Sequence, residues 1–375
     1  MNAINSSFIV LCTLLVLLMT PVLAMFYSGM VRSKNTLNTI MNCFIVFGVI
    51  TLQWVVFGFN FSFGKDEGLG LVGNFENFLL EGISGYNASG VPNILFVIFQ
   101  MMFALIASAI ITGSLVGRIK LGVLVIFLLF WSTLVYDVLA HMIWSSEGFL
   151  LKRGSLDFAG GGVVHISSGV AGLVGALMVG ARKSDDEDKN AHSIPYAFLG
   201  AILLFIGWLG FNAGSAGEMN DIAINAFIVS IISAACGYVD IYASLVIGAL
   251  SSVFCYFGLS FIKYKLKWDD SLDAFSLHGI GGIWGGIATG LFASAKVNPN
   301  VVAQNALGEG FFISGSLELL KEQIFAIVIC VVLSALVSFI IFKIISFFTD
   351  LRVKEEVEQE GLDVSLHGEK AYTLA

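Results

Sequence analysis

Four side chains that can carry a proton lie inside long apolar segments of the sequence: Asp137, His141, His165 and His278. Ionisable groups are costly within a lipid bilayer, so they are rare there and mark ion paths, proton relays or substrate sites. Histidine also donates or accepts a hydrogen bond according to its tautomer and changes charge near neutral pH. These residues are therefore candidates for binding a small polar solute or moving a proton.

Two of these histidines lie in matching sequence patterns. Each follows an aspartate by eight residues and precedes glycines by four and seven residues, which gives Asp157, His165, Gly169 and Gly172 in one segment and Asp270, His278, Gly282 and Gly285 in the other. In a helix these positions share one face, and glycine permits close backbone approach. We predict an inverted repeat with the substrate path between the histidines. The alternative is that each histidine bonds separately to a neighbouring helix.

The composition is that of a membrane protein. Of the 375 residues, 57% are hydrophobic and only 12% are charged, whereas a soluble domain has about 25% charged residues. The net charge of −8 excludes a nucleic-acid-binding protein. We expect no enzyme and no cofactor or metal, because no HExxH sequence, glycine-rich phosphate loop or CxxC pair is present. The five cysteines are interpreted as small core residues.

Ten apolar segments reach the length of about 18 residues that indicates a membrane-spanning helix. They are residues 8–31, 37–63, 92–117, 121–144, 158–181, 194–213, 222–239, 241–262, 274–295 and 323–342. The first segment lacks a positively charged start and is too long for a signal peptide, so we interpret it as a retained span. The 41 glycines and only four prolines favour closely packed helices with few kinks.

Lysine and arginine positions predict the orientation of these spans. Basic residues follow the first, third and fifth spans at Arg32, Arg118 and Arg182, which places these loops in the cytoplasm and the N-terminus outside. Further basic residues follow the span at 241–262 and the last span, and these should also be cytoplasmic.

The orientation rule fails if every segment crosses once, because residues 263–267 would then emerge outside. Residues 216–240 would have to cross an even number of times, yet 25 residues form only about 37 Å of helix and one crossing needs about 30 Å. We therefore predict that 222–239 is re-entrant or that the chain is shortened there. The alternative is that residues 263–267 do lie outside.

With these residues considered, the chain resembles the Amt/Mep/Rh ammonium transporter family, and the bacterial Amt branch in particular. The resemblance covers nearly the whole sequence. The motifs that carry it are AMFYSGMVRSKN at 24–35, FQMMFA at 99–104, AHMIW at 140–144, LDFAGGGVVHISSGVAGLVGA at 156–176, GWLGFNAGSAG at 207–217, DDSLDAFSLHGIGG at 269–282 and LRVKEEVEQEGLDVSLHGEKAY at 351–372.

The resemblance implies a role for a small set of residues. These are the pore pair His165 and His278, the aromatic gate Phe103 and Phe211, the outer ammonium-recruitment site Phe103, Trp144 and Ser215, and the supporting residues Asp157, Gln100, Trp208 and Asp270. Without the resemblance the aromatic residues would have no assigned role, because 33 phenylalanines are spread along the chain.

The resemblance also implies the organisation of the protein. It implies an all-α polytopic inverted-repeat bundle, with 9–10 spans here against eleven in the family, as a pore domain at 1–350 followed by a cytoplasmic regulatory tail at 351–375. We expect a homotrimer in the cell membrane, with an outside N-terminus and a cytoplasmic C-terminus, that binds a PII-type signalling protein through its tail. The expected substrate is ammonium or ammonia, with methylammonium as an analogue.

The expected function is transport of ammonium: recruitment of NH4+, deprotonation, and conduction of NH3 past the histidines. The sequence leaves open whether a proton moves separately, which would make transport electrogenic. The alternative function is an ammonium sensor, impaired in transport, that acts through a PII-type protein.

Two departures from the family pattern stand out. Only 63 residues separate Ser215 from His278, about 35 fewer than the resemblance implies, which corresponds to most of two membrane helices. The second departure is Asp137, where the family usually has an apolar residue or proline. Asp137, His141 and Trp144 share a helix face, so Asp137 either forms a hydrogen bond with His141 or adds a negative charge near the recruitment site.

Overall fold

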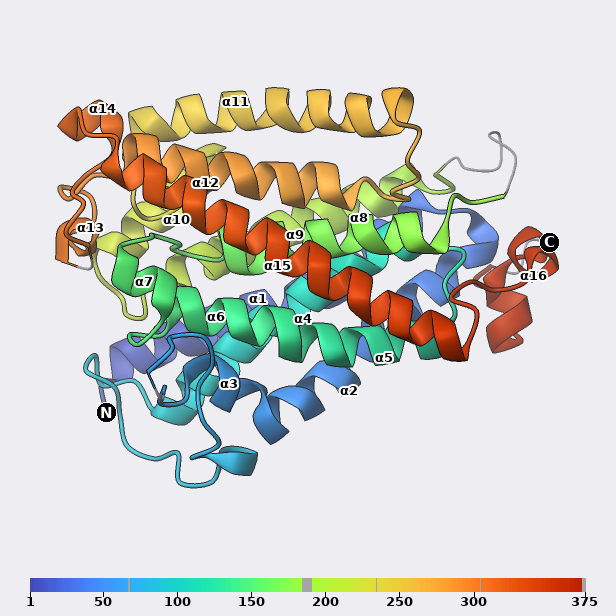
Figure 1. Cartoon of the computed structure of the whole chain (residues 1–375), viewed down its shortest axis with the longest axis horizontal. Helices are drawn as coiled ribbons and strands as arrows, with labels where there is room; N and C mark the ends of the chain where they lie inside the picture. Colours follow the sequence, from blue (N-terminus) through green and yellow to red (C-terminus); the bar gives the residue numbers. More distant parts are fainter. Residues whose placement is uncertain (67, 184–190, 234, 304, 373–375) are drawn as a thin grey trace.

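The computed structural model describes residues 1–66, 68–183, 191–233, 235–303 and 305–372. In these ranges the chain is almost entirely helical, with no β-strand longer than an isolated bridge, and its long helices lie side by side (Figure 1). Eight of the described helical segments are long and apolar enough to cross a membrane. The expected all-α polytopic fold is confirmed.

The longer helices form the bundle, and several continue into one another through π-helical turns. They are α1 (Ala3–Met30), α2 (Thr36–Gln53), α4 (Asn93–Leu115), α5 (Leu121–Trp131), α6 (Asp137–Trp144), α8 (Ser167–Val179), α9 (Ile194–Gly214), α11 (Ile241–Ser260), α12 (Ile280–Phe292) and α15 (Glu318–Phe348). The π-helical turns are η2 (Trp54–Gly58), η4 (Ser132–Tyr136), η5 (Gly161–Ile166), η7 (Phe261–Lys265), η8 (Phe275–Gly279) and η9 (Asp363–His367).

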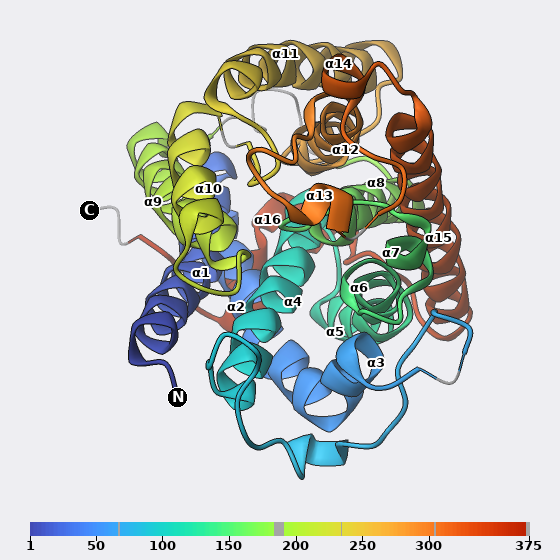
Figure 2. The same ribbon diagram turned by 90° about the vertical axis from the view of Figure 1, so that its left-hand side faces the viewer.

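The other helices lie mainly at the ends of the bundle. They are α3 (Phe59–Phe63), α7 (Phe149–Arg153), α10 (Asp221–Ser233), α13 (Asn300–Ala303), α14 (Phe311–Ser314) and α16 (Glu355–Glu360), with 3-10 turns at Ser33–Asn35 and Phe78–Leu80. The end-on view shows α7, α13 and α14 at the end of the bundle opposite α16 (Figure 2).

Small residues let the helices pack closely, as the high glycine content predicts. A side chain at Gly29 of α1 would lie 2.6 Å from the backbone nitrogen of Ala197, and one at Gly200 of α9 would lie 2.6 Å from that of Phe26. The absence of side chains at these positions therefore sets the distance between α1 and α9. In a bilayer such close van der Waals packing replaces the hydrophobic drive that acts in water.

Helix α10 does not cross the bundle. Its 13 residues reach about 20 Å, whereas a crossing needs about 30 Å. The chain then turns back: the side-chain amide of Asn225, near the start of α10, donates to the carbonyl of Val239 over 3.1 Å. Helix α11 therefore starts at the end of the bundle where α10 begins (Figure 1). A helix that turns back in this way agrees with the prediction that 222–239 is re-entrant or that the chain is shortened there.

The basic loops consequently meet at one end of the bundle. Arg182 forms an ion pair with Asp269 at 2.6 Å, Lys263 pairs with Asp273 at 3.2 Å, and the tail residue Glu355 pairs with Lys183. Residues 263–265 thus lie with the other basic clusters. Together η8 and α12 form a further helical stretch, Phe275–Phe292, which is not among the eight described segments that are long and apolar enough to cross, so the number of 9–10 spans stays a prediction.

The two histidine helices run in opposite directions. The guanidinium of Arg118 donates to the carbonyl of Gly180, directly after α8, and also to the carbonyl of Asp269 and the hydroxyl of Ser271, before η8. The end of one helix therefore lies beside the start of the other. This antiparallel arrangement is the one that the predicted inverted repeat requires.

The segment after α15 folds back onto the basic end. The Asp363 carboxylate accepts the backbone N–H groups of Leu37 and Asn38, over 3.0 and 2.9 Å, at the start of α2. Glu358 is fully buried and accepts hydrogen bonds from Arg352 and from the backbone of Lys183.

Burial raises the pKa of Asp269, but the hydrogen bonds and charge of Arg182 outweigh that effect and hold the pKa well below its usual range.

We predict that Arg118→Met destabilises the fold by at least about 2 kcal/mol, because buried acceptors would lose a charged donor. Arg118 is fully buried, and burial lowers its pKa to about 10, so it remains protonated at neutral pH. Denaturant unfolding of the purified protein measures the effect. Lys120→Met is the control, since the Lys120 side chain makes exposed contacts, a 3.3 Å hydrogen bond to the Thr349 hydroxyl and a 3.9 Å pair with Asp350, and its loss should change stability by less than about 0.5 kcal/mol. Equal losses in both variants would contradict the prediction.

Candidate functional site

Asp157 begins the helix that carries His165. One carboxylate oxygen accepts the backbone N–H groups of Gly160 and Gly161 over 2.6 and 2.8 Å, and the other accepts those of Gly162 and Val163 over 2.8 and 3.2 Å. These are the donors that the first turn of a helix leaves without partners. Asp157 therefore fixes the start of η5 and, through it, the position of the histidine.

Asp270 has the related position in the second repeat. Its carboxylate accepts the backbone N–H of Phe275 over 2.7 Å, at the first residue of η8. His165 and His278 both lie in π-helical turns, at matching places in η5 and η8. Such turns widen a helix locally and are frequent at functional sites. The matching aspartates recognised in the sequence are therefore both positioning residues at helix starts.

Glycine contacts hold the two repeats together. A side chain at Gly169 would lie 2.4 Å from the backbone nitrogen of Gly279, and one at Gly282 would lie 2.6 Å from the carbonyl oxygen of Gly161. Gly172 meets Ser114 of α4 instead. Gly285 is different, because a side chain there would meet no atom within 4 Å. The predicted close approach is therefore correct for three of the four glycines and wrong for Gly285, which faces open space.

The two repeats bring the histidines into direct contact. The Nδ1 atoms of His165 and His278 are 3.1 Å apart, and the ring planes differ by 8°. The alternative, in which each histidine bonds separately to another helix, is wrong. Because two neutral imidazoles share one proton between their Nδ1 atoms, one ring keeps a free acceptor at Nε2 and the other a donor at Nε2. The pair can therefore both accept from and donate to a small solute.

Aromatic rings stack beside this pair. Phe103 and Phe211 are both buried, with ring centroids 4.3 Å apart and an angle of 33° between the planes. Trp208 stacks on His165 at 5.1 Å, and the Phe211 ring is 6.0 Å from the same histidine. The phenylalanine pair that the resemblance implied as a gate thus lies next to the histidines.

Phe103 also borders a cavity with a volume of about 230 Å³, which we call the vestibule. Phe103 and Trp144 meet edge to face at 5.9 Å, and the Trp144 indole donates to the carbonyl of Asp157. The Ser215 hydroxyl donates to the Phe211 carbonyl over 2.8 Å, which leaves its oxygen free to accept. The three residues of the expected recruitment site therefore line one space, with Gln100 also on its wall.

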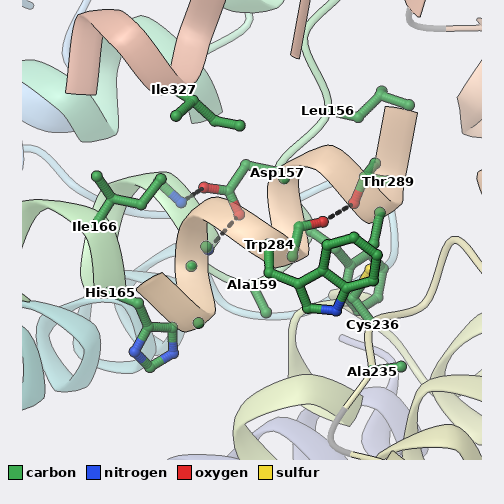
Figure 3. Close-up of a pocket in the computed structure, with 18 of the residues that line it drawn as sticks. Leu156, Asp157, Ala159, His165, Ile166, Ala235, Cys236, Trp284, Thr289 and Ile327 are labelled. Atoms are coloured by element: carbon green, nitrogen blue, oxygen red, sulfur yellow. Dashed lines mark hydrogen bonds between the residues drawn. The ribbon is translucent and has the colours of Figure 1, made fainter. Parts of the chain in front are cut away.

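The cavity on the other side of the phenylalanine pair, the lumen, has a volume of about 220 Å³. Phe211, Trp208 and both histidines line it, and Asp157 borders both the lumen and the vestibule. Figure 3 shows His165 on one side of the lumen and Cys236 on the other. The vestibule, the phenylalanine pair and the histidine pair therefore follow one another in space.

Sequence reasoning missed the residue that attaches α10 to this site. The Asn212 side-chain amide donates to the Ser230 hydroxyl over 2.7 Å and to the Ala235 carbonyl over 3.1 Å. Asn212 follows Phe211 directly, in the motif at 207–217, and no role was predicted for it. The signal in the sequence was an amide side chain near the end of an otherwise apolar helix, because an amide that is buried there needs hydrogen-bond partners.

The predicted hydrogen bond between Asp137 and His141 is wrong. The Asp137 carboxylate accepts the side chains of Gln53 at 2.6 Å and Ser62 at 3.2 Å. His141 contacts the Ser62 carbonyl at 3.2 Å through Nδ1 and the Asp66 carboxylate at 3.2 Å through Nε2. Segment 53–66 therefore supplies the partners of both residues. Asp137 is fully buried and does not line the vestibule.

Apolar helices around a buried polar pair, with the pair between two inverted repeats, form the architecture of a multi-pass membrane transporter. The chain belongs to the ammonium transporter family: the profile described as Ammonium Transporter Family matches residues 7–237 and 223–372. The resemblance noted in the sequence is thus confirmed.

Individual relatives agree with this assignment. The ammonium transporter of Bacillus subtilis is 41% identical over 98% of both chains, and ammonium transporter Amt1 of Archaeoglobus fulgidus is 38% identical over 98% of this chain and 99% of its own. The crystal structure of Saccharomyces cerevisiae Mep2 has a TM-score of 0.84 at 28% identity, over 95% of this chain and 88% of that one.

The comparisons also bear on the shortened segment. The two parts of the family match overlap at residues 223–237, within the re-entrant segment. The alignment with the Bacillus subtilis protein extends over 407 positions, so at least 32 of them have no counterpart among the 375 residues here. The discontinuity therefore falls where the sequence predicted a shortening.

We predict that Asp157→Asn lowers the free energy of unfolding by at least about 2 kcal/mol. Asparagine offers one acceptor oxygen to four buried N–H groups, and an unpaired buried donor costs about 1–3 kcal/mol. Thermal unfolding of the purified protein measures the loss. Asp240→Asn is the matched control, because Asp240 is an exposed N-cap of α11 bonded to Ala243 alone and asparagine caps as well as aspartate. An unchanged unfolding temperature in Asp157→Asn would refute the positioning role.

We predict that Asp137→Asn leaves the half-saturation concentration for methylammonium uptake unchanged, because Asp137 lies outside the vestibule. Initial uptake rates in proteoliposomes over a concentration series measure this value. Trp144→Leu is the comparison and should raise the value, because it removes an aromatic face from the vestibule. A higher value in Asp137→Asn would instead favour an electrostatic role in cation recruitment.

Proposed function

We propose that this protein moves ammonium across the cell membrane: NH4+ is recruited in the vestibule, loses a proton, and passes the phenylalanine pair as NH3 to reach the histidine pair. The observation that carries the proposal is the 3.1 Å contact between His165 and His278 at the wall of the lumen. Membership of the ammonium transporter family and the names of the relatives support the choice of substrate.

The vestibule has the groups that a cation with N–H donors needs. Phe103 and Trp144 can offer aromatic faces, which attract a cation, and Ser215 offers an acceptor oxygen. Potassium has a similar size but no hydrogen-bond donors, so directed acceptors distinguish the two ions. A cation–π contact contributes about 0.5–2 kcal/mol, less than the several kcal/mol that a charge costs in an apolar passage. Deprotonation at the mouth removes that cost.

Neutral ammonia then meets hydrogen-bonding groups matched to it. It can donate to the free Nε2 acceptor of one histidine and accept from the Nε2–H of the other. The same pair can carry the released proton in a separate step, because imidazole gains and loses a proton near neutral pH. Transport is electroneutral without this step and electrogenic with it, and a measured current distinguishes the two.

The assembly and regulation follow the family in this proposal. Residues 1–350 form the pore domain of a homotrimer in the cell membrane, with the N-terminus outside and the basic end in the cytoplasm. Residues 351–375 form a regulatory tail that a PII-type signalling protein binds. The buried hydrogen bonds of Glu358 and Asp363 support a tail with a defined docked state, which a partner can stabilise or displace.

A second candidate function is an ammonium sensor that transports poorly and acts through a PII-type protein. The observation that favours it is the re-entrant α10, which replaces membrane-crossing helix beside the lumen. Both functions use the same vestibule, and they differ in whether solute passes the histidines.

We predict that His165→Ala and His278→Ala each reduce labelled methylammonium uptake in proteoliposomes by about tenfold or more, since a buried solute would lose a hydrogen bond worth roughly 1–3 kcal/mol. His192→Ala is the control, because His192 contacts Val31 and Tyr372 outside the lumen. Uptake retained in both pore variants would contradict the role of the pair. No uptake by the well-folded parent protein would favour the sensor.

A further inference from the structure

The lumen is much larger than ammonia requires. Its volume is about 220 Å³, whereas a single water-sized molecule needs only about 15 Å³ of such space. The additional volume extends away from His165 toward Cys236 and Trp284 (Figure 3). We call this part of the lumen the side cavity.

The re-entrant segment and the second repeat form the walls of the side cavity. Ala235, Cys236 and Val239 come from the loop after α10, Ile247 comes from α11, and Trp284 and Ala288 come from α12. All six contribute apolar or weakly polar surface. The family match is discontinuous over residues 223–237, that is, in α10 and at the start of the loop that follows it, so part of this wall comes from the shortened segment.

Several polar groups around the side cavity are already paired within the protein. The Trp284 indole donates to the Ile247 carbonyl over 3.0 Å, and the Thr289 hydroxyl donates to the Gly285 carbonyl over 3.0 Å. Both oxygens of Asp157 accept backbone N–H groups. The hydroxyls of Ser155 and Ser233 are buried without a protein partner. The side cavity therefore fits an apolar group better than a charge.

Gly285 gives direct access to this space. It lines the lumen from α12, and a side chain there would meet no atom within 4 Å. The other glycines of the two histidine helices discussed above are needed for packing, so the gap at Gly285 is not explained by helix contact. It leaves room for part of a ligand on the wall of the lumen, about 10 Å along the helix axis from His278.

We propose that the side cavity binds the alkyl group of short primary amines of two to four carbons, with the amine nitrogen at the histidine pair. The inference rests on the proposed function only in placing the nitrogen at His165 and His278, and it widens the substrate class from ammonium to small alkylamines. The lumen and the vestibule share Ile143, Asp157 and Phe158 on their walls. The two cavities are therefore neighbours at these three residues as well as at the phenylalanine pair.

Equilibrium binding of labelled methylamine, ethylamine and propylamine to the purified protein tests this inference without requiring transport. Each buried methylene should tighten binding by about fourfold. Gly285→Val should abolish this gain with chain length and Gly285→Ala should reduce it, because their side chains occupy the side cavity. Gly48→Val is the matched control: Gly48 lies in α2, also has no atom within 4 Å of an added side chain, and does not line the lumen.

The outcomes separate the alkyl pocket from the transport function. Equal affinities for the three amines in the parent protein overturn the pocket, even if methylammonium uptake is normal. A gain with chain length that persists in Gly285→Val overturns its location. Tighter binding of ethanolamine than of propylamine would mean that the Ser155 and Ser233 hydroxyls bind a polar group of the ligand, and it overturns an alkyl site. If affinity rises with chain length in the parent protein but not in Gly285→Val, and the parent protein shows no uptake, the result supports the pocket and refutes transport.

Discussion

The close contact between the backbones of the two histidine helices is the constraint on which the site depends. Gly169 meets Gly279, and Gly282 meets Gly161, at distances where a single added carbon would overlap backbone atoms. A hydrogen bond between two imidazole nitrogens tolerates only a few tenths of an ångström of change. Separation of these helices by the width of a methyl group would therefore break the His165–His278 contact while leaving every helix intact.

Polar side chains around the lumen are used mainly for positioning. Asp157 and Asp270 accept backbone N–H groups at the starts of η5 and η8, and Arg118 donates to carbonyls where α8 ends. Helix ends that are buried in a protein within a bilayer have no water to satisfy them, so each needs a side-chain partner. The inverted repeat places one aspartate near the vestibule and the other near the basic end. As a result these charged groups stabilise the frame: even Asp157, which borders both cavities, has both carboxylate oxygens bonded to backbone N–H groups.

The sequence predicts the fold and much of the site because its strongest signals are local. Apolar length gives the helices, and the spacing of Asp157 and His165 repeats at Asp270 and His278. The contacts it does not predict are made by distant segments. Asp137 shares a helix face with His141, yet Gln53 and Ser62 are its partners. Likewise, the glycine spacing cannot distinguish Gly282, which meets another helix, from Gly285, which faces a cavity.

The shortened segment shows which features of such a bundle are free to change. Removal of one crossing would reverse the His278 helix, and its glycines would no longer face Gly161. Removal of material equivalent to two crossings leaves that direction intact, which explains why α10 turns back. A shorter helix leaves backbone groups near its end that need hydrogen-bond partners. For the carbonyl of Ala235 the partner is the Asn212 side-chain amide, which donates to it. The bundle thus keeps its histidine contact, and the lost helix volume is compatible with a wider lumen beside it.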